Sequence, residues 1–264
     1  MSKLQRLEAI LEEMGSCLLA FSGGVDSTFL MAVGSRVLGE RFAAVTARTF
    51  LAGEGEVEEA LRLAAGLGVR HEVVALDLEG MDWVREHPSD RCYLCKQAIF
   101  SVLQEKARGE GLSFVADATH TGDLQERRPG LKALEELGIR SPLREAGYTK
   151  REIREASKAA GLEGFDRPSS PCLATRIPFG SPVTGERLRR VAEAEEFLRG
   201  MGFTSPRVRD YGDTARIELR SGELAGAATE EARASIGAAL RELGYIYVAL
   251  DLMGYRTGSM DEVL

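Results

Sequence analysis

The feature that most restricts the fold of this 264-residue chain is an apolar run followed by a glycine-containing polar loop and a helical pattern. Residues 17–21 have the length and composition of a buried strand, and apolar residues recur at helical spacing over residues 28–38. Between them lies the string Ser22-Gly23-Gly24-Val25-Asp26-Ser27. Glycines let the backbone turn tightly and approach a ligand closely, and the amides at a helix start form an anion site. The sequence therefore predicts a strand–loop–helix unit that binds phosphate.

The side chains of this loop suit the same purpose. The hydroxyls of Ser22 and Ser27 can donate hydrogen bonds to phosphate oxygens. Asp26 has the same sign of charge as phosphate, so we expect it to hold Mg²⁺ or to accept backbone N–H bonds within the loop. A tight turn that binds nothing is the alternative. A Walker loop is excluded because the Gly-Lys-Ser/Thr ending is absent.

Strand and helix patterns then alternate along the first part of the chain. We predict an amphipathic helix before residue 16, strands at 42–48, 71–76 and 113–116, and helices at 54–67, 95–108, 131–137 and 150–160, the last with Thr149 as its N-cap. This alternation favours an α/β fold with an open parallel sheet and helices on both faces. Ligands bind such sheets at the carboxyl ends of the strands.

The composition changes where four prolines crowd into residues 167–182, which predicts a loop or linker. Beyond it we predict a helix at 184–201, strands at 207–211 and 215–220, a helix at 230–243 and a strand at 245–250. The sequence therefore predicts an α/β domain over residues 1–176 and a small C-terminal α+β domain over residues 177–264.

Composition restricts the class of partner. Apolar residues make up 44% and charged residues 28% of the chain, as in ordinary globular proteins, and the net charge of −7 gives no support for a nucleic-acid surface. No run of residues has the length and apolar character of a membrane span, and the charged N-terminal segment is unlike a signal peptide. We expect a cytoplasmic protein with no membrane or nucleic-acid partner.

The four cysteines divide into two kinds. Cys17 lies in the apolar first strand and is expected to be a core residue. Cys92 and Cys95 form a CxxC pair among charged residues, and Cys172 lies in a proline-rich loop. Three such thiols can hold a [4Fe–4S] cluster with one iron open, or zinc with a histidine as fourth ligand, and the CxxC pair alone can act as a redox dithiol.

The loop Ser22–Ser27 resembles the PP-loop of the ATP pyrophosphatases, a class that includes GMP synthetase, NAD synthetase, asparagine synthetase and several tRNA-thiolating enzymes. That resemblance implies cleavage of ATP between its α- and β-phosphates, an adenylated intermediate and release of pyrophosphate. Together with the cysteines, the chain resembles one subgroup, the ATP-dependent sacrificial sulfur transferases of the LarE type, which build the nickel-pincer nucleotide cofactor of lactate racemase. The segments that carry this resemblance are 22–27, 44–48, 91–96, 127–154, 167–180, 207–219 and 254–260.

The resemblance implies a reaction on pyridinium-3,5-dicarboxylate mononucleotide. ATP adenylates one carboxylate, and a sulfur nucleophile then displaces AMP and leaves a thiocarboxylate. Cys172 matches the family's sulfur-donating cysteine, which some members give up and convert to dehydroalanine. Cys92 and Cys95 match the extra pair of members that carry a three-cysteine [4Fe–4S] cluster and deliver a sulfide from it. We therefore expect delivery through a cluster in preference to the sacrifice of Cys172.

The site residues expected on this basis fall into groups by role. The catalytic residues are Cys172, Asp26 and Arg176. The residues for ATP and pyrophosphate are Ser22, Gly23, Gly24, Val25, Asp26, Ser27, Thr46 and Arg128, with Mg²⁺ as the companion ion. The residues for the mononucleotide phosphate are Arg207, Arg209 and Arg256, and the cluster ligands are Cys92, Cys95 and Cys172. In the family the phosphate pocket forms where subunits meet, which implies a homo-oligomer, with a hexamer as the expected form.

Some positions depart from the family pattern or suggest no function. Ala118 and His120 stand where the family often has glycine and asparagine, while Asp117 and Asp123 are retained as metal-side or phosphate-side candidates. Glu195 and Glu196 are predicted on a solvated helix face, although either could assist the chemistry or a metal.

Other classes of function remain open at this point. A tRNA thiolase of the PP-loop class could use three cysteines, but such enzymes usually carry further CxxC pairs and this chain has one. An amidotransferase-like synthetase would need a glutaminase domain, for which the chain has no room. A non-catalytic nucleotide or metal-binding regulator would not release pyrophosphate in proportion to substrate.

Overall fold

The computed structural model describes residues 1–53, 55–125, 129–166, 171–260 and 262. These residues form two compact units, each built from segments that are separated in the sequence. Unit 1 comprises Met1–Thr49, Glu54–Leu76 and Asp90–Ser170, and unit 2 comprises Phe50–Gly53, Asp77–Ser89 and Pro171–Leu264. The predicted boundary between residues 176 and 177 stays a prediction.

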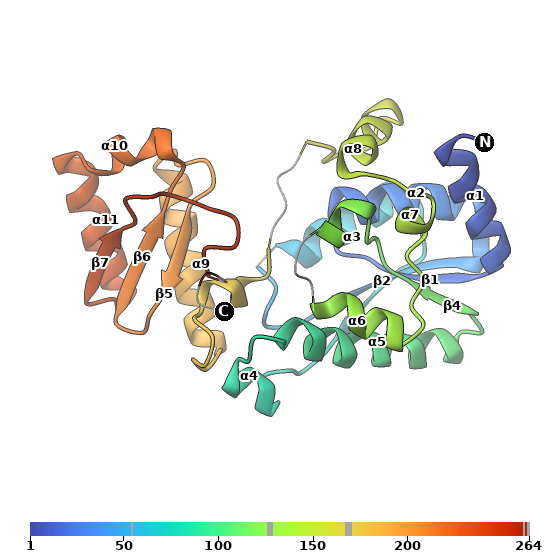
Figure 1. The fold of residues 1–264 in the computed structure, drawn as a ribbon, viewed down its shortest axis with the longest axis horizontal. Coiled ribbons are helices and arrows are strands. Elements are labelled where there is room, and N and C mark those ends of the chain that lie inside the picture. The colour runs from blue at the N-terminus through green and yellow to red at the C-terminus, as the bar shows by residue number, and fades with distance from the viewer. Residues whose placement is uncertain (54, 126–128, 167–170, 261, 263–264) are drawn as a thin grey trace. The chain divides into compact units, whose positions relative to one another are not determined.

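Unit 1 contains a four-stranded parallel sheet in the order β3-β2-β1-β4 (Figure 1). The strands are β1 (Cys17–Ala20), β2 (Phe42–Arg48), β3 (His71–Ala75) and β4 (Phe114–Ala116). Each lies where an apolar run predicted it. The first strand pairs with two neighbours, Leu18 lying opposite both Ala43 and Val115, so the loop that follows it is held at the centre of the sheet edge.

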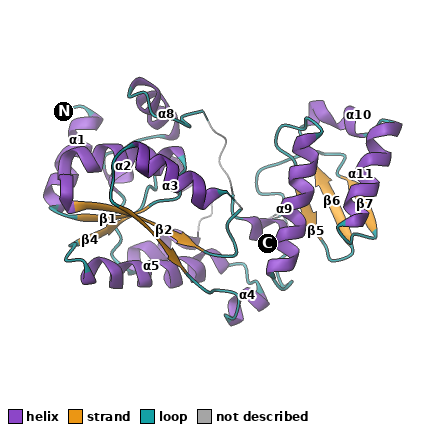
Figure 2. Cartoon of the chain, turned by 180° about the vertical axis from the view of Figure 1, so that it is seen from behind, coloured by secondary structure: helices purple, strands orange, loops and turns teal. Residues whose placement is uncertain are grey.

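Helices cover both faces of this sheet, as the alternating pattern predicted (Figure 2). On one face lie α1 (Lys3–Met14), α2 (Val25–Leu38) and α3 (Glu56–Gly66), with α8 (Lys150–Ala159) beside α2, and the short helix α7 (Pro142–Glu145) contacts α1. On the other face lie α5 (Arg91–Gly109) and α6 (Pro129–Glu136). The α/β fold is therefore confirmed.

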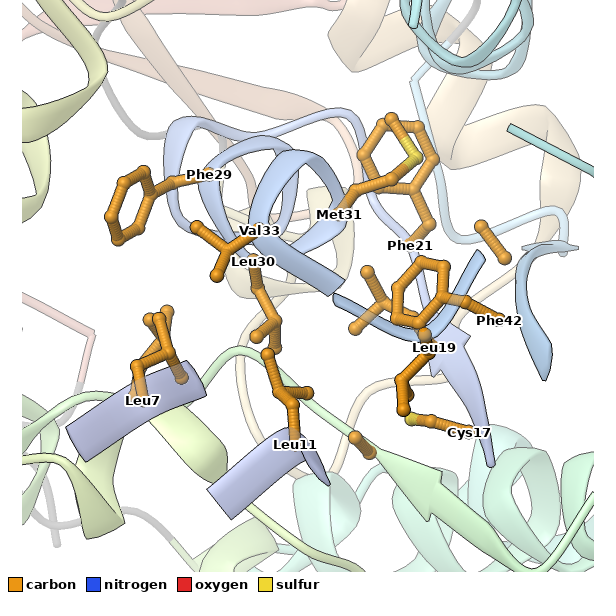
Figure 3. Packing of buried hydrophobic residues seen from close by; sticks show 14 of the residues in the cluster. Leu7, Leu11, Cys17, Leu19, Phe21, Phe29, Leu30, Met31, Val33 and Phe42 are labelled. Atoms are coloured by element: carbon orange, nitrogen blue, oxygen red, sulfur yellow. The ribbon is translucent and has the colours of Figure 1, made fainter. Parts of the chain in front are cut away.

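The core between α1, α2 and the sheet is apolar and closely packed (Figure 3). Leu7 and Leu11 of α1 and Leu30 of α2 are fully buried, and Phe21 is 3% exposed at the end of β1. Cys17 is 1% exposed in the same cluster, which confirms it as a core residue. Burial also raises the pKa of its thiol to about 12, with Arg140 opposing, so it stays protonated and unreactive.

Two helix starts in unit 1 bear on function. Thr149 caps α8 as predicted, in a reciprocal capping box with Glu152, which fixes the position of Lys150 at the first turn. Helix α5 begins at Arg91, whereas the sequence predicted its start at residue 95. The first turn, residues 91–94, contributes only Arg91 to the buried face of the helix, so no apolar stripe marked it and the periodicity missed it. Cys92 and Cys95 therefore lie within the helix and not before it.

Unit 2 contains a three-stranded sheet in the order β5-β6-β7. Strands β5 (Arg207–Asp210) and β6 (Thr214–Glu218) are antiparallel, and β7 (Tyr247–Leu250) is parallel to β6. Its helices are α9 (Gly185–Gly200), α10 (Leu224–Ala227), α11 (Glu230–Glu242) and the short α4 (Asp82–Glu86). Leu198 of α9, Leu240 of α11 and the inward residues of β5 and β6 form one apolar core. The predicted small α+β fold is confirmed.

The two early segments of unit 2 are held by backbone hydrogen bonds to its later part. Leu173 N donates to Leu51 O at 3.4 Å, Gly180 N to His87 O at 3.0 Å and Val183 N to Val84 O at 3.1 Å. The sequence indicated nothing of this, because both segments lack a pattern that distinguishes them from ordinary connections. Within the described ranges, no helix combines the length and apolar character needed to cross a membrane.

Candidate active site

The loop after β1 adopts a conformation that requires glycine. Phe21 N donates to Val45 O at 2.8 Å and so extends the pairing with β2 by one residue. Gly23 then has a φ of +73°, in the left-handed region that residues with a Cβ rarely adopt. Gly24 precedes α2 with extended φ and ψ angles of −75° and 161° and acts as its N-cap. The chain thus turns from strand to helix within a few residues.

The start of α2 presents unsatisfied backbone amides. The first helical bond runs from Thr28 N to Gly24 O at 2.9 Å, so the amides of Val25, Asp26 and Ser27 have no partner within the helix. Ser27 Oγ donates to Gly24 O at 3.0 Å and lies 3.2 Å from Ser22 Oγ. These contacts close the loop around its own backbone. The result is a helix N-terminus of the kind that binds phosphate.

Asp26 forms an ion pair with a residue that the sequence did not predict for the site. Its Oδ2 accepts from Lys150 Nζ, which comes from the first turn of α8. Its Oδ1 is buried and has no hydrogen-bond partner. Nothing in the local sequence marked Lys150 for this role, because Arg151 is a cation in the same first turn and its side chain is exposed.

The unpaired Asp26 Oδ1 fits a role in holding Mg²⁺. Protein sites for this ion often use one or two carboxylates, and phosphate oxygens and waters complete the octahedron. A buried carboxylate oxygen without a partner is costly unless something compensates it. Asp26 is thus available to a cation at the phosphate loop, and Lys150 is available to the phosphates themselves.

Thr46 lies buried on β2 beside the loop. Its hydroxyl donates to Phe21 O at 2.8 Å and lies 2.8 Å from His71 Nε2. Because the hydroxyl has one proton and donates it to Phe21 O, His71 donates to Thr46 from Nε2, which carries a proton. Burial lowers the pKa of His71, while Glu72 opposes the change. The Thr46 side chain thus supports the loop, and its predicted contact with ATP stays a prediction.

Asp117 lies at the carboxyl end of β4 and organises its surroundings. Its Oδ1 accepts from Ser141 Oγ at 2.7 Å and from Thr119 N at 3.2 Å, and its Oδ2 accepts from Thr119 Oγ1. Lys96 Nζ of α5 lies 3.6 Å from the same carboxylate. Both oxygens are therefore engaged within the protein. Asp117 is better suited to orient Lys96 and the loop than to hold a metal.

Ala118 and His120, the two departures from the family pattern, lie in the loop that follows Asp117. His120 is buried, its Nδ1 accepts from Gly122 N at 3.1 Å, and its backbone N donates to Asp123 Oδ2 at 2.9 Å. The imidazole thus stabilises the turn that follows β4. Arg128, predicted for ATP, lies outside the described residues.

Cys92 and Cys95 lie on one face of the first turns of α5, because residues three apart on a helix are neighbours. Cys92 is exposed and Cys95 is half-buried. Helix α6 approaches closely here. A Cβ on Gly130 would lie 3.3 Å from Cys92 O and 2.8 Å from Lys96 Cδ. The pair can offer two thiolates to one metal, and Cys172 belongs to unit 2. Among the described residues, no group of three or more histidine, cysteine, aspartate or glutamate side chains gathers as a metal site.

Cys172 begins a short turn in unit 2 and is exposed. Its Sγ lies 3.7 Å from Leu51 O, and its carbonyl accepts from Thr175 N at 3.0 Å. Arg176, which we predicted as catalytic, is buried and forms a bidentate ion pair with Glu195 at 2.8 and 3.0 Å. The prediction of a solvated face was therefore wrong for Glu195. It is confirmed for Glu196, which is exposed and pairs with Arg199.

The three arginines predicted for substrate phosphate lie in unit 2 in different environments. Arg209 is buried and donates to Glu218 at 2.5 Å, and Arg256 pairs with Glu262 at 3.1 Å. Arg207 is half-buried, lies 5.5 Å from the ring centre of Tyr255 and, within the described part of the chain, pairs with no carboxylate.

Among the described residues the charge of Arg207 has no ion-pair partner, and the carboxylate of Glu195 compensates it only in part. Burial lowers its pKa, and the neighbouring charges of Arg176 and Arg209 lower it further, while Glu195 and Tyr255 oppose them. An anion beside this guanidinium would relieve the unfavourable interaction. Of the three predicted phosphate ligands, Arg207 is the one whose surroundings favour an anion most.

The parallel sheet, the glycine loop at its edge and the Asp26–Lys150 pair define an ATP-using enzyme of the PP-loop class. Its curated relatives carry the identification further. The chain is 34% identical over 264 residues to the pyridinium-3,5-bisthiocarboxylic acid mononucleotide synthase of Lactiplantibacillus plantarum, covering all of this chain and 95% of that protein. The chain belongs to the family of that synthase.

Other relatives agree with this placement. An uncharacterized protein of Synechocystis is 37% identical over 263 residues, with 98% of its length covered. The GMP synthase of Aeropyrum pernix is 28% identical over 218 residues, which cover 41% of that larger protein. No protein-family model matches the chain.

Proposed function

We propose that this enzyme uses ATP to adenylate a carboxylate of pyridinium-3,5-dicarboxylate mononucleotide and then converts it to a thiocarboxylate. The product would serve the synthesis of the nickel-pincer nucleotide cofactor of lactate racemase. The observation that carries the proposal is the full-length similarity to the Lactiplantibacillus plantarum protein, which is named as a synthase of pyridinium-3,5-bisthiocarboxylic acid mononucleotide. The phosphate loop with its Asp26–Lys150 pair supports the first step.

In the first step a carboxylate oxygen of the substrate attacks the α-phosphorus of ATP, and the bond to pyrophosphate breaks. The amides of Val25, Asp26 and Ser27 and the ammonium group of Lys150 stabilise the negative charge that pyrophosphate carries away. Asp26 would hold Mg²⁺, which supplies further charge stabilisation when bound. Activation is needed because oxide is a poor leaving group and AMP is a good one.

In the second step a sulfur nucleophile attacks the activated carbonyl carbon. The C–O bond to AMP breaks, the carboxylate oxygen leaves on the phosphate of AMP, and sulfur takes its place. Cys172 would contribute this sulfur chemistry, because it is the exposed cysteine of unit 2 and lies on a turn fixed by hydrogen bonds.

We propose that the sulfur arrives through a [4Fe–4S] cluster held by Cys92, Cys95 and Cys172. The exposure of Cys92 and Cys172 and the helix spacing of the CxxC pair suit this ligand set. When bound, a cluster with three cysteine ligands supplies one iron that is open to an exchangeable sulfur. The alternative is a single turnover in which Cys172 gives up its own sulfur.

The substrate phosphate is proposed to bind at Arg207, with Arg209 and Arg256 in support. A homo-oligomer, with a hexamer as the expected form, and a cytoplasmic location complete the proposal. A PP-loop tRNA thiolase is the second candidate, and the net charge of −7 disfavours it.

The proposal is tested by mixing the oxygen-free protein with ATP and the dicarboxylate mononucleotide. We expect AMP and pyrophosphate in equal amounts, together with a product whose mass shows sulfur in place of oxygen. A tRNA substrate serves as the control. Pyrophosphate release that does not depend on the mononucleotide, or AMP release without a sulfur-containing product from any donor, would contradict the proposal.

The sulfur source is tested by assaying iron and acid-labile sulfide in the same preparation. We expect about four irons per chain with a broad visible charge-transfer band. The variants Cys92→Ala, Cys95→Ala and Cys172→Ala should each lose the iron, and full iron in all three would exclude the cluster. An iron-free protein that loses the mass of one sulfur from Cys172 after turnover would instead show sacrifice.

A further inference from the structure

The turn that carries Cys172 is wrapped around a single guanidinium group. Arg176 Nη1 donates to Pro171 O at 3.0 Å, to Thr175 Oγ1 at 2.9 Å and, over a longer distance of 3.4 Å, to Cys172 O. One nitrogen therefore gathers acceptors from both sides of the cysteine. These contacts turn the carbonyl groups of the turn inward.

The other side of the same guanidinium is tied to the body of unit 2. Arg176 Nε and Nη2 donate to the two carboxylate oxygens of Glu195 on α9. Glu195 Oε1 also accepts from Val208 N of β5 at 3.1 Å. Arg176 and Glu195 are each 3% exposed. The Cys172 turn is thus connected through two buried side chains to both a helix and a strand.

The environment of Arg176 leaves it little capacity for an anion. Its Nε, Nη1 and Nη2 all donate to protein acceptors, and Glu195 already compensates its charge. Cys172, in contrast, is exposed although its backbone is fixed. A bidentate guanidinium holds a fixed planar geometry that a lysine cannot reproduce.

We propose that Arg176 and Glu195 are positioning residues that hold Cys172 for sulfur transfer, and that Arg176 is not a phosphate ligand. This inference depends on the proposed function, because it assigns the pair to the sulfur-transfer step. A buried ion pair is weak evidence for stability, since apolar residues of similar volume often stabilise as well. We therefore assign the Arg176–Glu195 pair the role of fixing the geometry of the Cys172 turn.

The test compares three variants with a matched control in the full-length protein. Arg176→Lys keeps the positive charge but removes the planar guanidinium that bonds to both oxygens of Glu195. Glu195→Gln keeps the shape of the side chain but removes its negative charge. The double variant Arg176→Met/Glu195→Leu replaces the whole pair with apolar side chains. The control is Arg190→Lys, because Arg190 also pairs with a fully buried carboxylate of unit 2, that of Asp210, but its hydrogen bonds do not involve the Cys172 turn.

The readouts are the kcat and KM of thiocarboxylate formation, the rate of ATP–pyrophosphate exchange with the mononucleotide, and the unfolding midpoint. In Arg176→Lys we expect the ratio of sulfur transfer to exchange to fall about 100-fold, as misplacement of a reacting group by 1 Å produces. The KM for the mononucleotide should change less than about twofold, because uniform binding is unaffected. The double variant should fold and remain slow, with its unfolding midpoint lowered only by the loss of the acceptor for Val208 N. Arg190→Lys should keep the wild-type ratio.

Several results would overturn the inference. A raised KM with unchanged kcat in Arg176→Lys would make this residue a substrate ligand. Recovery of kcat in the double variant would show that the pair stabilises the fold and nothing more. A wild-type protein without substrate-dependent exchange would contradict the proposed function itself, and is thereby distinguished from a failure of this inference.

Discussion

The phosphate loop Ser22–Ser27 and the Cys172 turn Pro171–Ile177 use the polarity of the backbone in opposite ways. In the phosphate loop, glycines shape the turn and the helix start leaves the N–H groups of Val25, Asp26 and Ser27 without partners within the helix. In the Cys172 turn, Arg176 and Thr175 bind the carbonyl oxygens. The first arrangement attracts an anion, and the second fixes a side chain without attracting one.

The charged side chains of the two regions differ in the same sense. Asp26 keeps one buried oxygen without a partner, and Lys150 is 34% exposed, so both can respond to a ligand. Arg176 and Glu195 satisfy each other away from solvent. The Asp26–Lys150 pair, proposed to bind ATP, therefore keeps a polar atom without a partner. The Arg176–Glu195 pair, proposed to position Cys172, has its polar atoms engaged within the protein. The following variants test that distinction, from the largest expected effect to the smallest.

The largest effect is expected for Cys172→Ala. Removing the thiol should abolish thiocarboxylate formation, whereas substrate-dependent ATP–pyrophosphate exchange should persist, because the phosphate loop lies in unit 1. Both are measured by mass spectrometry and by exchange of labelled pyrophosphate. If the variant forms the product at the wild-type rate, the Cys172 turn is not the sulfur-transfer region.

The next effect is expected for Lys150→Met, which removes the cation that faces Asp26. We expect exchange to slow about 100-fold, the usual cost of one charge-stabilising donor. Arg151→Met is the matched control, because Arg151 follows on α8 and its side chain is 84% exposed. Equal exchange rates in the two variants would show that Lys150 does not stabilise the charge on the ATP phosphates.

Arg207→Met should weaken substrate binding without affecting the phosphate loop. We expect the KM for the mononucleotide to rise about 10- to 100-fold, because loss of one charged hydrogen bond costs about 1.5–3 kcal/mol and each ~1.4 kcal/mol is a factor of ten. Arg256→Met should raise it less, since Arg256 already pairs with Glu262 at the surface. A larger effect at Arg256, measured by steady-state kinetics, would place the phosphate elsewhere.

Gly23→Ala tests the backbone of the phosphate loop. A Cβ here would meet Ala60 at an ordinary 3.5 Å, so the cost is the left-handed conformation, about 1–2 kcal/mol. Gly24→Ala is the control, because its φ is −75° and its Cβ would meet Ser22 Oγ at 3.4 Å. Urea unfolding should therefore show the greater destabilisation for Gly23→Ala, and equal losses would contradict the strained turn.

The smallest effect is expected for His71, whose imidazole contacts Thr46 beside the phosphate loop. Because the pKa of His71 is lowered in the folded protein, the unfolded chain binds the extra proton near pH 6.5 and below. The free energy of unfolding should therefore fall as pH drops below about 6.5. In His71→Gln the dependence of the free energy of unfolding on pH should become weaker, by at most the contribution of one bound proton. An unchanged slope in urea unfolding at pH 7.5 and 5.5 would exclude His71 as its source.

Much of the fold followed from local pattern. The strands of unit 1 are short apolar runs, and Thr149 capped its helix as its position indicated. The phosphate loop was predictable because all of its parts are adjacent in the chain. Lys150 was not, since its partner Asp26 lies 124 residues away and spacing carries no information over that distance.

Glu195 shows a second kind of failure. Helix α9 is rich in arginine and glutamate, which favoured a solvated face. Yet Leu188, Val191 and Leu198 are buried, and with Glu195 they recur at intervals of three and four residues. A carboxylate within an apolar stripe needs a buried cation. The stripe was visible in the sequence, but its partner Arg176 was not identifiable from it.

The discontinuous make-up of unit 2 has a consequence for how the chain folds during synthesis. Phe50–Gly53 and Asp77–Ser89 leave the ribosome well before Pro171–Val183, to which their backbones are bonded. Domains generally fold as units during translation, so the parallel sheet can form while these two segments wait. We expect a nascent chain halted at residue 170 to be cut by protease first within these segments, and the full-length chain to be protected there.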